Sequence, residues 1–181
     1  MYYRMETDGM QLTAFVEKDF GPAIFKLTIG SCYGAEEDEL PFRFSYRDPY
    51  DKPLLDYIAG KCVMSRRLVE TLEMAGVNNL QKFKAELRDE KSDLVNRDFY
   101  VVNVIGLVAA ANFSKPESLP LGGGHVFTNL TVIPGEAHDL LMFRLAESLI
   151  DVIVHEQVAK VIEAGNFRGV LLTPVSFKEG T

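Results

Sequence analysis

One short stretch of the chain comes close to a metal-binding motif. His155-Glu156 begins the HExxH pattern of metalloproteases, in which two imidazoles one helical turn apart hold zinc. Ala159 stands where the second His must be, so the pattern lacks a ligand. His125 and His138 lie in other segments, at no spacing that implies a shared ligand set. The histidines therefore predict neither a metal site nor a catalytic base.

Three successive glycines, Gly122 to Gly124, offer backbone amides that could contact a phosphate. A phosphate-binding loop also needs a Lys and a hydroxyl residue after the glycines, at the start of a helix. His125 and a β-rich segment follow instead, so we expect a flexible turn. The sequence contains neither G-x-S-x-G nor G-x-G-x-x-G. We therefore predict no catalytic residue and no cofactor.

The two cysteines, Cys32 and Cys62, stand alone, without a C-x-x-C motif or a Cys/His spacing. Such isolated thiols are usually small buried residues, and we expect both to be buried. A site assembled from residues distant in sequence is the alternative to a protein without chemistry. Its candidates are Arg144, Glu147 and His138, although Arg144 and Glu147 at i, i+3 spacing are also typical of a surface ion pair on a helix.

Charge suggests a partner. Nineteen basic and twenty-six acidic residues give a net charge of −7, which disfavours nucleic acids and anionic membranes and favours a basic partner. Solubility alone would explain the same charge. Four acids stand together at Glu36, Glu37, Asp38 and Glu39, and adjacent carboxylates repel one another unless a cation or a basic surface lies near. We place a provisional partner-binding site on this run; a solvated loop is the alternative.

Length and composition predict a single α+β domain over residues 1–181, with 47% hydrophobic and 25% charged residues. Residues 34–53 and 113–124 are rich in Pro, Gly and polar residues, and we expect both stretches to be loops. The first twenty residues contain no apolar run typical of a signal peptide, and no segment approaches the ~20 apolar residues of a membrane helix. We expect a cytoplasmic protein without a membrane partner; the oligomeric state is not predicted.

Two segments have the apolar spacing of an amphipathic helix. One covers residues 65–75, with Ser65 as its cap and Gly76 at its end, and the other covers residues 155–164 before Gly165. A strand is expected before and after each helix in a mixed or mainly antiparallel sheet. This arrangement gives two similar strand-helix-strand units that share a sheet. The alternative is that two unrelated amphipathic helices have the same hydrophobic pattern by coincidence.

The remaining apolar runs predict strands. The expected strands are an edge strand opened by Tyr2 and Tyr3, residues 23–28, residues 80–87, a central strand over residues 98–112, and residues 125–133, 150–154 and 169–177. Eight apolar residues are expected to be buried in one core or two adjoining cores. They are Leu68, Leu72, Val102, Val104, Phe143, Val158, Ile162 and Val170.

Several segments are similar in sequence to segments of a known protein family. Residues 98–106 read DFYVVNVIG, residues 63–68 read VMSRRL, and residues 142–148 read MFRLAES, followed by a helix, Gly169 and Pro174-Val175. With the opening tyrosines, these segments resemble a family of bacterial proteins grouped among the immunity proteins of polymorphic toxin systems. The likeness extends from about Asp56 to Phe177. The chain departs from the pattern where His155-Glu156-Gln157 replaces Ser-Glu-Arg and where Arg66 replaces a Glu.

The resemblance implies a function that needs no catalytic residue. An immunity protein of this kind is expected to bind a cognate toxin encoded beside it in the cytoplasm and to block the toxin's active site or a required movement. Immunity proteins against basic nucleases are often acidic, which would suit the net charge of −7. The sequence thus predicts an immunity protein rather than an enzyme, with a small-molecule-binding or enzymatic α+β protein as the alternative.

Overall fold

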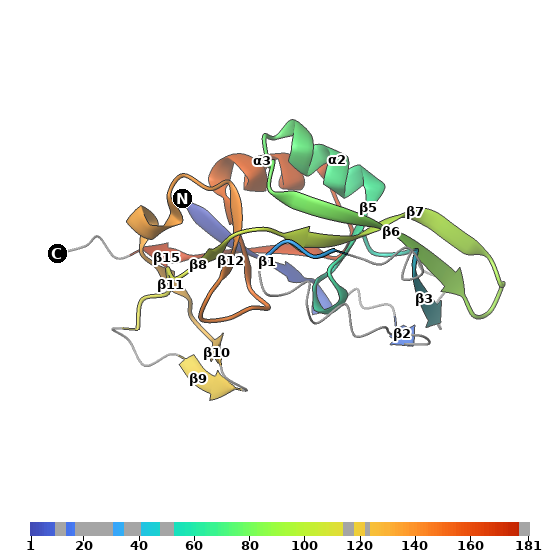
Figure 1. Ribbon diagram of the computed structural model, residues 1–181, viewed down its shortest axis with the longest axis horizontal. Helices are drawn as coiled ribbons and strands as arrows, with labels where there is room; N and C mark the ends of the chain where they lie inside the picture. Colours follow the sequence, from blue (N-terminus) through green and yellow to red (C-terminus); the bar gives the residue numbers. More distant parts are fainter. Residues whose placement is uncertain are drawn as a thin grey trace.

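The fold is α+β, and the two α-helices of the described residues pack against mainly antiparallel sheets (Figure 1). The computed structural model describes residues 1–9, 14–16, 31–34, 41–47, 53–113, 118–121 and 124–177. Within these residues, a five-stranded sheet has the order β14-β1-β13-β12-β8 and a six-stranded sheet has the order β2-β3-β6-β7-β5-β4. Two short two-stranded sheets, β10-β9 and β11-β15, complete the strands.

The elements follow one another along the chain with these bounds: β1 (Tyr2–Thr7), β2 (Ala14–Val16), β3 (Phe42–Arg47), β4 (Tyr57–Ile58), the 3-10 helix η3 (Ala59–Lys61), β5 (Val63–Ser65), α2 (Arg66–Met74), β6 (Leu80–Asp89), β7 (Val95–Val104), β8 (Leu107–Val108), β9 (Ser118–Leu121), β10 (Gly124–Phe127), β11 (Thr131–Val132), the 3-10 helix η4 (Pro134–Ala137), β12 (Met142–Leu145), β13 (Val152–His155), α3 (Glu156–Gly165), β14 (Val170–Pro174) and β15 (Ser176–Phe177).

Both predicted helices are confirmed, and α2 begins and ends as its sequence indicates. The Ser65 hydroxyl accepts a hydrogen bond from the Leu68 amide at 3.2 Å, which satisfies one free N–H of the first turn. At the other end, Gly76 has a φ of +97°, and the amides of Gly76 and Val77 donate back to Glu73 and Leu72. This pair of bonds is the Schellman motif, for which glycine is the favoured residue.

Helix α3 begins at the histidine that resembles half of a metal motif. The His155 Nδ1 accepts a hydrogen bond from the Gln157 amide at 3.3 Å, so this side chain caps the helix. The helix runs one residue beyond its predicted end at Ala164 and stops at Asn166, whose φ of +47° lies in the left-handed region that Asn tolerates. His155 therefore has a structural role at the start of α3.

The two strand-helix-strand units have the same arrangement. In the first unit, β5 and β6 flank β7, and in the second unit, β13 and β14 flank β1. The flanked strand is antiparallel to both of its neighbours in each case. The units occupy two sheets, however, and do not share one. The flanked strand follows the first unit in the chain but precedes the second, so a shift of the sequence by a fixed interval aligns only the helices and their flanking strands.

Several predicted strands and loops are wrong in detail. Strand β1 is not an edge strand, since it pairs with β14 on one side and β13 on the other. The predicted loop over residues 34–53 contains β3, in which Phe42 and Phe44 are buried on one face. The predicted loop over residues 113–124 contains β9 and the first residue of β10, which form a hairpin. Strands β3 and β9 are short and lie among prolines and glycines, so they are hard to recognise in the sequence.

The long strand predicted over residues 98–112 is two strands in different sheets. β7 ends at Val104, and Gly106, with a φ of +120°, turns the chain so that β8 joins the five-stranded sheet beside β12. The predicted strands over residues 125–133 and 169–177 are likewise each divided into two strands in different sheets. The strand predicted over residues 23–28 lies outside the described residues.

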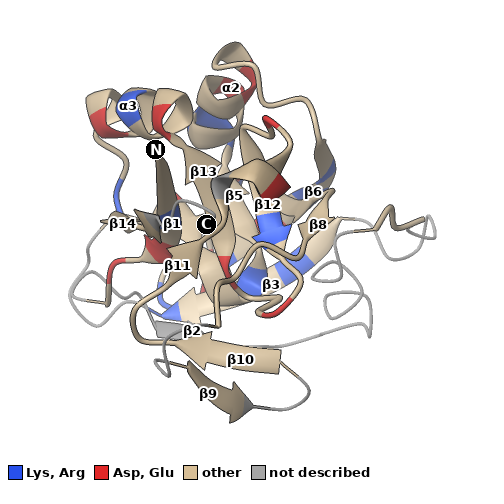
Figure 2. Cartoon of the chain, turned by 90° about the vertical axis from the view of Figure 1, so that its left-hand side faces the viewer, with Lys and Arg blue, Asp and Glu red and all other residues tan. Residues whose placement is uncertain are grey.

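The buried apolar residues form three cores. The first lies between the two helices and both large sheets, and Figure 2 shows α2 and α3 side by side on that side of the molecule. The second lies on the opposite face of the six-stranded sheet and the third on the opposite face of the five-stranded sheet. The predicted core is confirmed: six of its eight residues lie in the first core, Val170 packs against that core, and Phe143 lies in the third.

Asp56 joins the two units. Its carboxylate accepts hydrogen bonds from the Ser65 hydroxyl at 2.5 Å, from the Arg67 guanidinium at 2.8 Å and from the Arg168 amide at 2.8 Å. Ser65 caps α2, while Arg168 lies just before β14 in the second unit. One side chain thus fixes the start of one helix to the strand connection of the other unit.

Candidate functional site

One face of the six-stranded sheet is only partly covered by the helices. Along β6, Phe83, Ala85 and Leu87 are buried on the side of the second core, while Lys82 and Lys84 project from the opposite face. That opposite face lies under α2 near Val102 and Val104, but β6 and β7 extend well beyond the helix (Figure 1). The extension leaves a solvent-exposed sheet surface beside α2.

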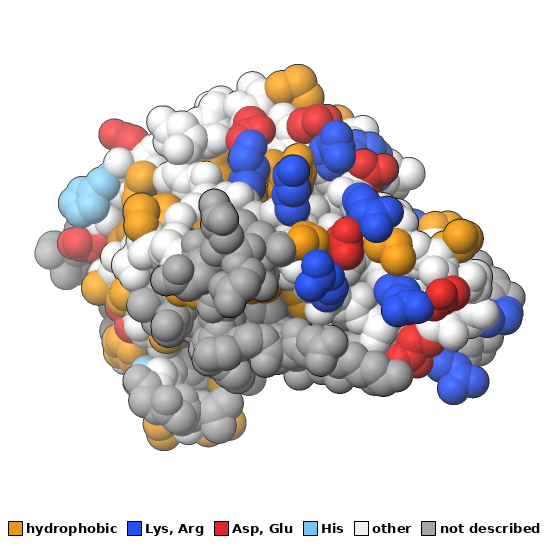
Figure 3. Space-filling view, turned by 45° about the vertical axis from the view of Figure 1, so that its right-hand side comes forward, with side chains coloured by type: hydrophobic (Ala, Val, Ile, Leu, Met, Phe, Trp, Pro, Cys, Tyr) orange, Lys and Arg blue, Asp and Glu red, His pale blue; other side chains and the backbone are white. Residues whose placement is uncertain are grey.

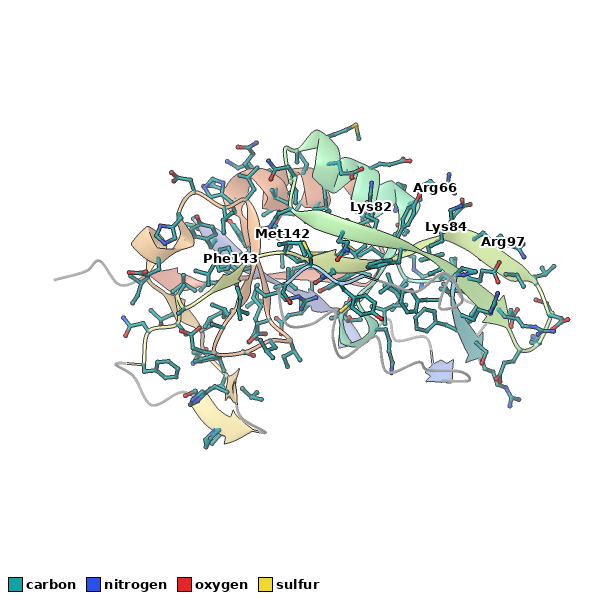
Figure 4. The ribbon with its side chains drawn as sticks, in the orientation of Figure 1. Arg66, Lys82, Lys84, Arg97, Met142 and Phe143 are labelled. Atoms are coloured by element: carbon teal, nitrogen blue, oxygen red, sulfur yellow. The ribbon has the colours of Figure 1, made fainter. Side chains whose placement is uncertain are left out.

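Cationic side chains gather on this exposed surface. We call them the cationic strip: Arg43 of β3, Arg66 of α2, Lys82 and Lys84 of β6, and Arg97 of β7. Figure 4 shows four of them along the side of the sheet that carries the helices, and Figure 3 shows Lys and Arg side chains with acids between them. The side chains of Arg43, Arg66 and Arg97 are 62%, 49% and 67% exposed. The strip is therefore accessible to a partner.

Three acids pair with four of the five cations. Glu86 accepts from Arg97 Nε at 2.8 Å and lies 3.4 Å from Arg43 Nε, so two guanidinium groups share one carboxylate.

The other two pairs are separate. Asp98 lies 3.0 Å from Arg66, and Glu73 lies 2.5 Å from Lys82. The five cations and the three acids that pair with them sum to +2, although the whole chain carries −7. Such exposed pairs contribute little to stability, about 0 to 1 kcal/mol each.

Lys84 is the cation whose charge no acid offsets. In the part of the chain that the structure describes, no hydrogen bond or ion pair joins Lys84 to another residue. Its neighbour across the strands is Tyr100, which is half-buried. The Lys82 ammonium lies 6.0 Å from the centre of the same ring. The middle of the strip thus combines a half-buried aromatic ring with an ammonium group that has no acid partner among the described residues.

A hollow of about 640 Å³ lies at the end of the strip that is remote from the helices. Its lining residues are Arg43, Phe44, Ser45, Glu86, Arg88, Glu90, Asp93 and Val95. The polar groups are largely paired with one another: Arg88 Nε donates to Asp93 at 2.6 Å, and the Ser45 hydroxyl donates to Glu90 at 3.2 Å. The hollow continues the strip through Arg43 and Glu86 and carries both signs of charge.

The residues expected to form a distributed site do not meet. Arg144 is 3% exposed in β12, where its guanidinium donates to the Leu149 carbonyl at 2.9 Å and to the Cys62 sulfur at 3.3 Å. Glu147 accepts from the Ala111 amide, and His138 is exposed in a left-handed turn. No contact among the described residues joins the three side chains. The predicted surface ion pair is also wrong, because residues 142–145 form a strand and not a helix.

The buried surroundings of Arg144 contain further titratable groups. Burial raises the pKa of the Tyr57 hydroxyl, and its neighbours include Cys62, Arg144 and Asp151. Burial also raises the pKa of the Asp151 carboxyl, against the opposing effects of a Ser148 hydrogen bond and the Arg4 charge. Tyr57, Cys62 and Arg144 are 1%, 3% and 3% exposed. These groups are closed to a partner, so we assign them to the interior of the fold.

The other predicted positions have simple outcomes. Cys62 is buried as expected, but the prediction is wrong for Cys32, which is exposed; both are free thiols. Gly124 is the first residue of β10, the second strand of the hairpin, and Gly122 and Gly123 lie outside the described residues. Within the described ranges, no group of three or more His, Cys, Asp or Glu residues could hold a metal ion. None of the described helices combines the length and apolar character needed to cross a membrane.

The acidic run predicted as a provisional partner site lies outside the described residues. It consists of Glu36, Glu37, Asp38 and Glu39. The cationic strip, by contrast, was not predicted. Its signal is present in the sequence as QKFKAELR over residues 81–88, where charged residues alternate with buried ones at the period of a strand. The alternation marks one face as exposed, but only the sheet order brings Arg43 and Arg97 to that face.

No model of a protein family matches the chain, and no curated protein is significantly similar to it. The candidate site therefore stands on its own geometry.

Proposed function

We propose that this protein is a cytoplasmic immunity protein that binds and neutralises a cognate toxin encoded nearby. The observation that carries the proposal is the cationic strip, a charged sheet surface that α2 leaves uncovered. The resemblance of residues 56–177 to immunity proteins of polymorphic toxin systems supports the same function. Inhibition by binding needs a complementary surface and no reacting group.

The strip has properties that suit an inhibitor. Its residues project from a hydrogen-bonded sheet and from the first turn of a helix, so the backbone is held in place before binding and little ordering is lost. Stable protein interfaces bury about 800 Å² on each partner, and the strip together with the adjoining hollow provides a continuous surface across β3, β6 and β7. Charged surfaces also raise association rates, which favours capture of a toxin soon after it appears.

Co-expression tests this proposal. The chain is produced in a bacterial host together with the product of the gene next to its own, and growth and complex formation are measured. We expect the neighbouring product to arrest growth, the chain to restore growth, and the two proteins to purify together. A neighbouring product that stays toxic in the presence of the folded chain, with no complex on size exclusion, would contradict the proposal.

The hollow supports a second candidate function, the binding of a small molecule. Its volume of about 640 Å³, with two arginines and three acids in its lining, would suit a small ligand that carries groups of both signs. A thermal-shift screen of small zwitterions distinguishes this candidate. It predicts a ligand that raises the melting temperature of the wild type but not of Arg88→Ala, and the immunity proposal requires no such ligand.

A further inference from the structure

We infer that the cationic strip docks against an acidic, carboxylate-rich protein surface. The inference rests on the proposed function for the identity of the partner, but not for the chemistry of the contact. It reverses the sign that the net charge suggests, since an acidic chain favours a basic partner. The five cations of the strip and the three acids paired with them sum to +2.

The local charge decides the contact because salt limits the range of the remaining charges. At physiological ionic strength, interactions between exposed charges fall off over about 8 Å. A docked surface therefore encounters Lys84, Arg97 and Arg43 more strongly than acids elsewhere on the molecule. Lys84 has no acid partner among the described residues, so its ammonium group is a candidate contact for a partner carboxylate.

The arginines of the strip keep donors available for carboxylates. Arg97 and Arg43 each reach Glu86 through Nε, and their Nη groups make no contact with another described residue. A guanidinium group has five N–H donors in a planar fork that matches a carboxylate. Each arginine can therefore hold Glu86 and a partner carboxylate at the same time. Glu86 fixes the two side chains in place and lowers the cost of ordering them on binding.

The interleaved acids favour a protein over a nucleic acid. Glu73, Glu86 and Asp98 lie between the cations, at 2.5 to 3.4 Å from their partners. A nucleic acid carries one phosphate per ~1.7 Å of duplex axis, so a bound duplex would place phosphates over these carboxylates as well. A protein surface can set an acid opposite each cation and a basic or neutral group opposite each acid. The half-buried ring of Tyr100 adds the kind of aromatic residue that is enriched at protein interfaces.

A titration followed by ¹⁵N NMR tests the inference without the natural partner. The probes are a ten-residue poly-glutamate peptide and a ten-nucleotide oligo-dT. We expect the peptide to shift the amides of β6, β7 and the first turn of α2, with an affinity that falls at higher salt. Shifts that are absent or confined to other elements would overturn the inference, as would tighter binding of oligo-dT to the same face.

A matched pair of variants separates the position of a charge from its sign. Lys84→Glu changes a strip residue, and Lys160→Glu makes the same change in net charge on α3, where Lys160 is 70% exposed and pairs with Glu156. We expect Lys84→Glu to weaken peptide binding about tenfold and Lys160→Glu to leave it within about twofold. Equal losses in the two variants would overturn the inference. Peptide binding at the strip without protection from the neighbouring toxin would contradict the proposed function alone.

Discussion

Replacement of Asp56 by Ala tests whether one carboxylate holds the two units together. The side chain is 13% exposed and accepts hydrogen bonds from Ser65, Arg67 and the Arg168 amide. The Arg67 side chain is 56% exposed, so its ion pair contributes about 0 to 1 kcal/mol. The Ser65 hydroxyl is buried, and a buried polar group that loses its partner costs about 1 to 3 kcal/mol.

These contributions, with a net loss of about 1 kcal/mol at the Arg168 amide, predict a decrease of about 2 to 5 kcal/mol in the free energy of unfolding. Asp98→Ala is the control, because Asp98 also pairs with an arginine but is 74% exposed, and it should change stability by less than about 1 kcal/mol. Urea denaturation followed by circular dichroism measures both variants. Equal stability of the two variants would refute the role given to Asp56.

Three further changes probe the core, the backbone and a buried acid. Leu72→Ala should lower the free energy of unfolding by about 3 to 5 kcal/mol, because Leu72 is 0% exposed. Met74 is 82% exposed on the same helix, so Met74→Ala should change the free energy of unfolding by less than about 0.5 kcal/mol. Urea denaturation measures both variants. Gly169→Ala should lower the free energy of unfolding by more than about 1 kcal/mol, because the φ of Gly169 is +75° and an added Cβ would lie 2.9 Å from a neighbouring side chain. Gly135 has open space around it, so Gly135→Ala should lower the free energy of unfolding by less in the same assay. Burial raises the pKa of Asp151 above 3.8, so its protonated form favours the folded state, and its contribution is full below that pH and is lost as the pH rises through the folded pKa. Asp151→Asn should therefore gain stability relative to the wild type as the pH rises above about 4, and a constant difference in urea midpoint would contradict this sign.

The helices could be predicted from sequence because their signals are local. Ser65 as a cap, Gly76 at a positive φ and apolar residues at helical spacing act within a few residues of one another. The division of residues 98–112 between two sheets could not be predicted in this way. The turn at Gly106 depends on β12, which lies far along the chain and pairs with β8. The Arg144 amide of β12 donates a hydrogen bond to the Gly106 carbonyl.

The candidate site shows the same limit. The alternation around Lys82 and Lys84 exposes one face of β6, and this much is local. Arg43 reaches that face only because β3 pairs in parallel with β6, and its strand was hidden within a stretch of prolines and acids. Net charge could not indicate this strip of cations, because it averages over the whole chain.

Titration of the purified neighbouring gene product with the wild type and with Lys84→Glu tests the central claim most directly. The measurement is the dissociation constant by calorimetry at two salt concentrations, with Lys160→Glu as the control for net charge. We expect a stable complex with the wild type and with Lys160→Glu, and binding about tenfold weaker for Lys84→Glu. Binding of all three proteins should weaken at high salt. An unchanged dissociation constant for Lys84→Glu would contradict the role of the strip, and no complex with the wild type would contradict toxin neutralisation itself.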